Sequence, residues 1–359
     1  YNTKDLGMDM KMHKAMAVIQ FKLEGQIIKR RPEFMLEDRL LLDKINFEKG
    51  TVMVEGREYK MRDMDFPTID PANPYELTPE ETEVMERLRQ AFTRCDKLQK
   101  DVRFLFSKGG LYKVYNSNLL YHGCVPLCED GSLKTVRIYG HEYKGKSLYE
   151  VLESYVRKGF YAIDAGERQR GRDMMWYIWL NENSPLFGKD KMATFERYFI
   201  DDKKPHAEAK GCYYAHMEDV EACNMILKAF GLDPAASHII SGHIPVKRGK
   251  GESPVKAGGR LLMIDGGFSR AYQPETGIAG YTLIYNSHGL QLVQHEPFES
   301  RRRAIEEGKD ILSTKFVVES TATRITVRDT TIGKELLLQI EDLKRLLSAY
   351  RSGLIKERK

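Results

Sequence analysis

The feature that most constrains the fold is a change of pattern near residue 109. Before it, apolar side chains recur mostly with helical spacing, and after it short apolar runs alternate with amphipathic helical stretches. Five runs have the length and composition of strands, at residues 119–121, 136–139, 238–240, 261–264 and 281–285. Strands that alternate with helices indicate a layered α/β or α+β body rather than a helical bundle or a pure β-sandwich.

Residues 1–108 predict a mostly helical section with one small hairpin. A helical pattern over 10–28 ends before Pro32, and residues 51–54 and 57–60 predict two strands around a glycine turn. Thr78 is the expected N-cap of a long helix that begins with Pro79, carries a capping-box Glu81 and ends near residue 109. The apolar stripe expected to be buried along that helix consists of Val84, Leu88, Phe92, Cys95 and Val102.

The rest of the chain predicts two further parts. Residues 109–333 form the body with the strands, and helices are expected near 148–156 and 220–230. Residues 334–359 predict a terminal helix whose apolar side chains repeat every three or four residues over about two heptads. Because two heptads are few for a coiled coil, this helix is expected to pack on the chain's own body.

Composition excludes several classes of protein. The 57 Lys and Arg exceed the 52 Asp and Glu by 57 − 52 = +5, a surplus too small for a dedicated nucleic-acid binder. No run approaches the roughly 18 apolar residues of a membrane span, and no secretory signal is present, so a cytoplasmic protein is expected. The five cysteines are odd in number and include no CxxC pair, which predicts reduced thiols rather than a disulfide framework or a zinc site.

Two histidines follow predicted strands in the same layout. His122 and His243 each lie beside a glycine directly after an apolar run. A strand end holds an imidazole on a rigid support, and a glycine leaves room for a metal ion, so both are candidate metal ligands. The alternative is a hydrogen-bonded histidine at a tight turn. His238, five residues before His243, is a candidate for orienting the site.

A basic, glycine-rich segment follows His243. Five cations oppose the single acidic Glu252 between residues 247 and 260. These candidate phosphate-binding residues are Lys247, Arg248, Lys250, Lys256 and Arg260. Such a loop can hold a phosphate with backbone N–H groups and charged side chains, although it lacks the Walker arrangement. The alternative is a solvated surface loop.

Several long strings resemble one enzyme family. Residues 122–127 (HGCVPL), 184–189 (SPLFGK), 191–199 (KMATFERYF) and 241–285 closely resemble class 3 fructose-1,6-bisphosphatase, the type found in Firmicutes. That family belongs to the calcineurin-like metallophosphoesterases. The resemblance implies a two-sheet metallophosphoesterase core flanked by helices, and a pair of metal ions, usually manganese. It also implies hydrolysis of the 1-phosphate of fructose 1,6-bisphosphate to fructose 6-phosphate in gluconeogenesis.

The superfamily's motifs are matched only in part. His122 and His243 match the last two motif elements, a His-Gly and a Gly-His, whereas the earlier Asp-x-His, Gly-Asp and Gly-Asn-His elements have no match. The resemblance therefore implies that the amino-terminal half of the core, with the catalytic histidine, is missing. Residues 109–333 would then be the carboxy-terminal half of that core. A chain that begins with Tyr1 rather than Met is compatible with this expectation, and alone it should be inactive.

The sequence alone leaves two other functions open. One is a phosphoesterase of different specificity, because the metal chemistry does not choose the alcohol. The other is a non-catalytic binding or regulatory module. The expected partner is a small sugar bisphosphate, with no nucleic acid and no membrane, and a homo-oligomer is compatible with the sequence.

Overall fold

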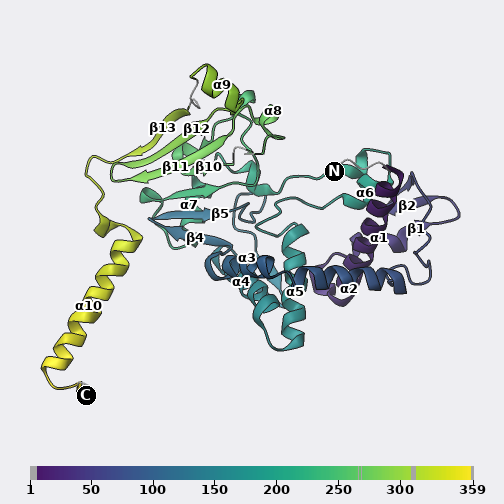
Figure 1. The fold of residues 1–359 in the computed structure, drawn as a ribbon, viewed down its shortest axis with the longest axis horizontal. Helices are drawn as coiled ribbons and strands as arrows, with labels where there is room; N and C mark the ends of the chain where they lie inside the picture. The colour runs from purple at the N-terminus through teal and green to yellow at the C-terminus, as the bar shows by residue number, and fades with distance from the viewer. Residues whose placement is uncertain (1–5, 266, 268, 309–312, 357–359) are drawn as a thin grey trace. The chain divides into compact units, whose positions relative to one another are not determined.

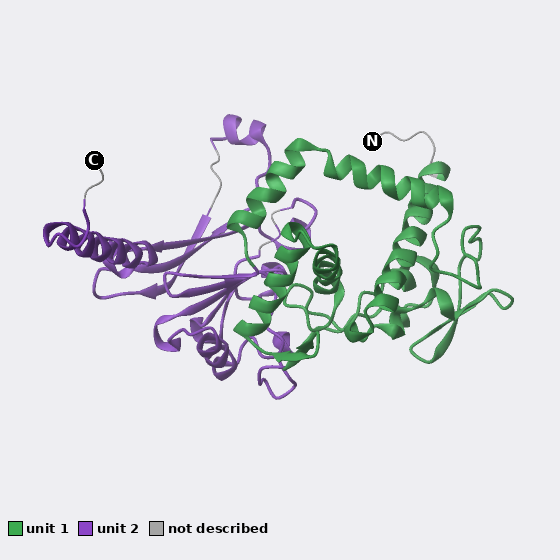
Figure 2. Cartoon of the chain, turned by 90° about the horizontal axis from the view of Figure 1, so that it is seen from below, with its two compact units in different colours: residues 1–110, 135–211 green, residues 111–134, 212–359 purple. Residues whose placement is uncertain are grey.

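The computed structural model describes residues 6–265, 267, 269–308 and 313–356, and the chain divides into two compact units (Figure 2). Unit 1 comprises residues 1–110 and 135–211, and unit 2 comprises residues 111–134 and 212–359. This differs from the predicted division, in which 109–333 formed one body. The reason is strand pairing: β5 (Asn118–Tyr121) pairs with β8 (His238–Ser241), so the intervening residues 135–211 leave the sheet and join unit 1.

Unit 1 contains most of the helices (Figure 1). Its helices are α1 (Leu6–Arg30), α2 (Pro79–Thr93), α3 (Asp96–Lys108), α4 (Lys146–Tyr161), α5 (Ala165–Leu180) and α6 (Thr194–Phe199). Its strands form a sheet β1 (Ile45–Asn46), β2 (Thr51–Val54), β3 (Arg57–Lys60) and a hairpin β6 (Val136–Ile138), β7 (His141–Tyr143). The predicted first helix and the hairpin at 51–60 are confirmed, with Glu55 and Gly56 at positive φ in the turn.

The core of unit 1 joins α1, the small sheet and the segment around α6. Phe21 of α1 packs edge-to-face on Phe195, and Phe199 does the same on Phe66. One cation is buried beside this core: Lys22 is fully buried, and its Nζ lies 2.7 Å from Glu81 Oε2. Burying a lysine is costly unless it is paired, so this contact ties α1 to the first turn of α2.

The long helix predicted after Thr78 is two helices. Thr78 caps α2 with the expected capping box, but the helix is interrupted at Arg94–Cys95, and α3 begins after this interruption. The predicted buried stripe is wrong: Val84 and Phe92 are 40% and 62% exposed, and no apolar side chain of α2 or α3 is buried. Helical periodicity identified an amphipathic face correctly, but it carries no information on what covers that face.

Unit 2 is built on two sheets. The five-stranded sheet has the order β4 (Tyr112–Tyr115), β5, β8, β10 (Leu261–Met263), β9 (Val255–Lys256), and β5, β8 and β10 are parallel. The antiparallel three-stranded sheet comprises β11 (Gly280–Asn286), β12 (Gly289–His295) and β13 (Ser313–Ser320). The helices of unit 2 are α7 (Val220–Ala229), α8 (Gln273–Thr276), α9 (Arg301–Glu306) and α10 (Thr331–Arg351).

The two sheets pack on each other through apolar side chains. Ile240 of β8 and Leu262 of β10 meet Leu290 of β12, with Leu283 and Val318 at the margin of the cluster. Because side chains alternate along a strand, the neighbours of Ile240 and Leu262 face the other way, where α7 contacts β8. The predicted α/β architecture is therefore confirmed, with strands at all five predicted positions, although residues 136–139 contribute to unit 1.

The terminal helix is present but does not pack as expected. In α10 (yellow in Figure 1), Leu336, Leu343 and Leu347 are 46%, 63% and 49% exposed, and only Gly333 is buried. The expectation that its seam packs on the chain's own body is wrong for the described residues. The helix is held at its start, where Thr331 and Asn116 exchange two hydrogen bonds. No helix in the described part of the chain combines the length and apolar character that crossing a membrane requires.

Candidate metal and phosphate site

The two predicted metal ligands lie together in unit 2. β5 ends at Tyr121 and β8 at Ser241, so His122 and His243 follow neighbouring parallel strands at the same sheet edge. His122 Nε2 lies 3.1 Å from His243 Nδ1, and the rings meet edge-to-face with centroids 5.0 Å apart. The backbone also links them, because the Gly242 N–H donates to the His122 carbonyl at 2.9 Å.

The backbone at His243 is unusual. Its φ is +68°, and the Ile244 N–H donates to the Gly242 carbonyl at 2.8 Å, which makes His243 the central residue of a γ-turn. A non-glycine residue in this conformation costs free energy, and such strain concentrates at functional sites. The turn directs the chain away from β8 immediately after the imidazole.

A carboxylate that the sequence analysis missed lies at the same edge. Asp265 follows β10, the third parallel strand, and a methyl group placed on Gly242 would lie 3.6 Å from Asp265 Cβ and 3.9 Å from its Oδ2. The Asp265 carbonyl accepts from Val246 N–H at 2.9 Å, which fixes the segment after His243. The signal was available: Asp265 follows an apolar run and precedes a glycine, as the two histidines adjoin one.

The histidine pair fits one cation but is not a complete site. Two metal–nitrogen bonds of about 2.1 Å at a right angle would place the nitrogens about 3.0 Å apart, close to the observed 3.1 Å. In the described residues, however, no group of three or more His, Cys, Asp and Glu side chains is arranged to hold a metal ion. Among the described residues, the histidine pair can therefore supply two ligands of an ion.

His238 does not orient this site. Its Nδ1 lies 2.8 Å from the Gly259 carbonyl, and its Nε2 lies 3.0 Å from Glu319 Oε2. His238 begins β8 whereas His243 lies beyond its end, and each strand residue advances the chain by about 3.3 Å. The prediction is wrong because His238 lies at the opposite edge of the sheet, where it links β8 to β13.

The five predicted phosphate-binding residues divide into two groups. Lys247, Arg248 and Lys250 lie in the loop that leaves His243, whose one acidic residue, Glu252, accepts from the Lys247 backbone N–H at 2.9 Å. Arg248 lies over the Phe316 ring of β13, with its guanidinium carbon 5.7 Å from the ring centroid. This group remains a candidate anion-binding loop.

The other two cations are not placed for this role. Lys256 Nζ lies 2.7 Å from Glu218 Oε1. This contact lowers the pKa of Glu218 and pairs the lysine ammonium group with a carboxylate. Arg260 directly precedes β10, and its carbonyl accepts from Ile239, so it lies at the strand-entry edge with His238. Both predictions failed because spacing along a loop does not show which way the chain turns.

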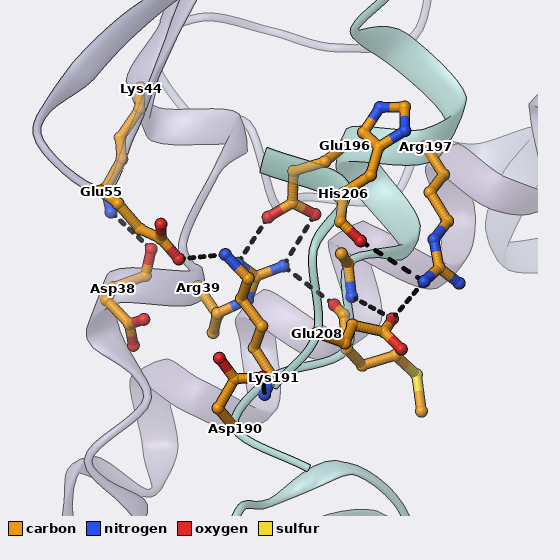
Figure 3. Close-up of polar contacts among 12 residues, drawn as sticks. Asp38, Arg39, Lys44, Glu55, Asp190, Lys191, Glu196, Arg197, His206 and Glu208 are labelled. Carbon is orange, nitrogen blue, oxygen red and sulfur yellow. Dashed lines mark hydrogen bonds and ion pairs between the residues drawn. The ribbon is translucent and has the colours of Figure 1, made fainter. Parts of the chain in front are cut away.

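A second cluster of charged side chains lies in unit 1 (Figure 3). Arg39 donates to both carboxylate oxygens of the buried Glu196, at 2.6 and 3.0 Å. Glu208 accepts from Lys189 at 2.7 Å and lies 3.0 Å from Arg197. Burial acts to raise the pKa of Glu208, but Lys189, the Ala193 N–H and Arg197 together outweigh it and lower the pKa below the usual value. Because Glu196 is paired with Arg39, this cluster holds the 189–208 segment to an earlier part of unit 1.

Comparisons with known proteins agree with one another. A family model described as Firmicute fructose-1,6-bisphosphatase matches residues 1–352. A class 3 fructose-1,6-bisphosphatase of Clostridium tetani is 58% identical over 354 residues, which cover 98% of this chain and 54% of that protein. The protein of the same name from Bacteroides fragilis is 57% identical over 359 residues, covering 100% of this chain and 54% of its own length. The chain thus spans about half the length of the curated relatives it matches, and no solved structure matches it.

Proposed function

The chain belongs to the Firmicute fructose-1,6-bisphosphatase family, and from this we propose that it takes part in hydrolysing fructose 1,6-bisphosphate to fructose 6-phosphate and phosphate. The observation that carries the proposal is the juxtaposition of His122 and His243 at the end of two parallel strands, in a chain whose relatives bear this enzyme's name. The reaction removes the 1-phosphate and serves gluconeogenesis. The scaffold proposed for it is the two-sheet metallophosphoesterase core.

His122 and His243 are proposed as two ligands of one divalent ion, manganese in this proposal. Such an ion, when bound, polarises phosphate oxygens and makes a coordinated water more acidic. The imidazoles act as neutral ligands, not as acids or bases, and the glycine at 242 keeps the space between the His122 carbonyl and Asp265 open. Lys247, Arg248 and Lys250 are proposed to bind the substrate's phosphates, because a cationic loop directly after a ligand brings donors to the anion.

The first experiment measures phosphate release in the presence of Mn²⁺ from fructose 1,6-bisphosphate and a panel of other phosphate esters. It uses this chain and, in parallel, the Clostridium tetani relative, with alanine at the positions of His122 and His243. We expect the relative to prefer the sugar bisphosphate and to lose activity on either substitution, whereas alanine at the exposed His288 serves as the control. Equal turnover of unrelated esters would replace this proposal with a phosphoesterase of different specificity.

The second experiment is Mn²⁺ calorimetry on this chain. Two imidazoles without a third ligand among the described residues should bind the ion weakly, and the chain alone should be inactive. His122→Ala should abolish even this weak binding. Tight binding of two ions would contradict the two-ligand site.

A further inference from the structure

Two buried polar atoms on the inner face of the three-stranded sheet lack partners. Tyr281 of β11 and Gln294 of β12 are paired across the strands and are 4% and 7% exposed. Within the described chain, the Tyr281 hydroxyl and Gln294 Oε1 make no hydrogen bond. A buried polar atom without a partner is destabilising by about 1–3 kcal/mol, so two of them on paired residues require an explanation.

These atoms share a face with the packing between the sheets. Tyr281 and Leu283 are two residues apart and so point to the same side, and Leu283 contacts the cluster formed with the five-stranded sheet. Leu283 is opposite Leu292, which is opposite Phe316. Phe316 therefore belongs to the same face as Tyr281 and Gln294.

The cationic loop after His243 reaches this face. Arg248 lies over the Phe316 ring at 5.7 Å, and its positive charge acts on the Tyr281 hydroxyl, opposing the effect of burial on the pKa of that group. The loop also lies against the turn before β11, since a methyl group on Gly277 would be 3.2 Å from the Gly249 nitrogen. Arg248 thus lies over the Phe316 ring, on the sheet face that also carries the buried Tyr281 hydroxyl.

The three groups match the chemistry of a phosphorylated polyol. A guanidinium and a phenolic O–H are both donors and suit phosphate oxygens. Gln294 Nε2 donates to Glu296 Oε1 at 3.2 Å, which leaves the amide oxygen as a free acceptor for a hydroxyl group. We propose that Arg248 and Tyr281 bind the phosphate of a sugar phosphate and that Gln294 accepts a hydrogen bond from a sugar hydroxyl.

The class of ligand rests on the proposed function, whereas the subsite rests on the two unpartnered atoms. The test therefore measures binding rather than turnover, by calorimetry of inorganic phosphate and of fructose 6-phosphate with this chain. Tyr281→Phe removes only the hydroxyl and should weaken both ligands about tenfold or more, because hydrogen bonds to charged groups are strong. Tyr285→Phe, on the same strand with a more exposed ring, is the matched control and should change neither affinity.

Gln294→Met tests the sugar contact separately. It should weaken fructose 6-phosphate and leave inorganic phosphate unchanged, which also reports that the variant is folded. In the absence of ligand, Tyr281→Phe should raise the melting temperature, because an unsatisfied buried hydroxyl is removed. A hydroxyl that merely binds a structural water would give the opposite result, a lower melting temperature with unchanged phosphate affinity, and would overturn the subsite.

The outcome is separable from that of the proposed function. Weaker binding in Tyr281→Phe together with no turnover of fructose 1,6-bisphosphate by the longer relative would retain the subsite and reject the activity. Turnover by the relative together with unchanged binding in Tyr281→Phe would reject the subsite and retain the activity.

Discussion

The backbone strain at His243 predicts that the usual order of stability of alanine and glycine variants is reversed at this position. At most positions alanine is more stabilising than glycine by about 0.4–1 kcal/mol, because glycine adds conformational entropy to the unfolded chain. At His243, φ is +68°, a region that costs an L-residue about 1–2 kcal/mol and costs glycine nothing. The net difference is about 1 kcal/mol, so unit 2 should be more stable in His243→Gly than in His243→Ala.

The matched pair at His122 isolates this effect. All four variants lose the imidazole contact of 3.1 Å, so that loss cancels within each pair. His122 is not among the residues with positive φ, so His122→Ala should be more stable than His122→Gly by the usual margin. The difference in stability between the alanine and glycine variants should therefore have opposite signs at His122 and His243, although their side chains are in contact.

The assay must report on unit 2. Both tryptophans, Trp176 and Trp179, lie in α5 of unit 1, so their fluorescence follows the wrong unit and serves as an internal reference. Amide hydrogen exchange of β8 is suitable, because the Ile239 N–H donates to the Arg260 carbonyl at 2.8 Å and is buried. Slower exchange in His243→Gly than in His243→Ala is expected. If alanine protects β8 as well as glycine does, the left-handed conformation at His243 carries no strain and the reasoning fails.

Three further predictions concern stability and anion binding. Asp173 accepts hydrogen bonds from Arg30, Gln169 and Arg31, which outweigh burial and lower its pKa below the usual 3.8. Its stabilising contribution is thus present above that value and lost as the pH falls through the lowered pKa, and Asp173→Asn should be destabilising by about 3–5 kcal/mol at pH 7 in urea unfolding of unit 1. Leu343→Ser on exposed α10 should change the free energy of unfolding by less than about 0.5 kcal/mol. Leu262→Ser between the sheets should lower the free energy of unfolding by at least about 2 kcal/mol. Equal effects of the two substitutions would mean that the apolar face of α10 is covered. Lys256→Ala should leave the affinity for inorganic phosphate unchanged by calorimetry, because Glu218 already occupies that ammonium group, and a tenfold loss would return Lys256 to the phosphate site.

The sequence predicted what depends on local pattern. Strand positions and the capping box at Thr78 follow from short segments, and the edge shared by His122 and His243 follows from one rule about strand ends. Asp265 obeys the same rule and was overlooked. The sequence could not predict that α2 and α10 expose their apolar faces, because periodicity describes one partner of a contact and not the other.

Predictions that required the path of a loop failed for a different reason. Lys247 and Arg260 lie 13 residues apart in one basic segment. Between them β9, which is antiparallel to β10, carries the chain back along the sheet to the start of β10. Charge density along the sequence therefore overestimated the number of cations near the histidines. Conversely, the sequence carries no signal of function at Tyr281, Gln294 and Phe316. Each has the pattern of an ordinary strand residue, and only the pairing of β11, β12 and β13 places them on one face.

The candidate site assembles from parts of the chain that are distant in sequence. His122 and His243 are 121 residues apart, and the pairing of β5 with β8 across the excluded segment 135–211 is what brings them together. The loop that carries Arg248 is then fixed at one end by the Asp265 carbonyl, and Arg248 itself lies over Phe316 of the second sheet. The imidazole pair requires only the five-stranded sheet, whereas the Arg248–Tyr281 subsite also requires the three-stranded sheet to dock. A substitution that separates the sheets, such as Leu290→Ser, should therefore weaken phosphate binding while the histidine pair stays assembled.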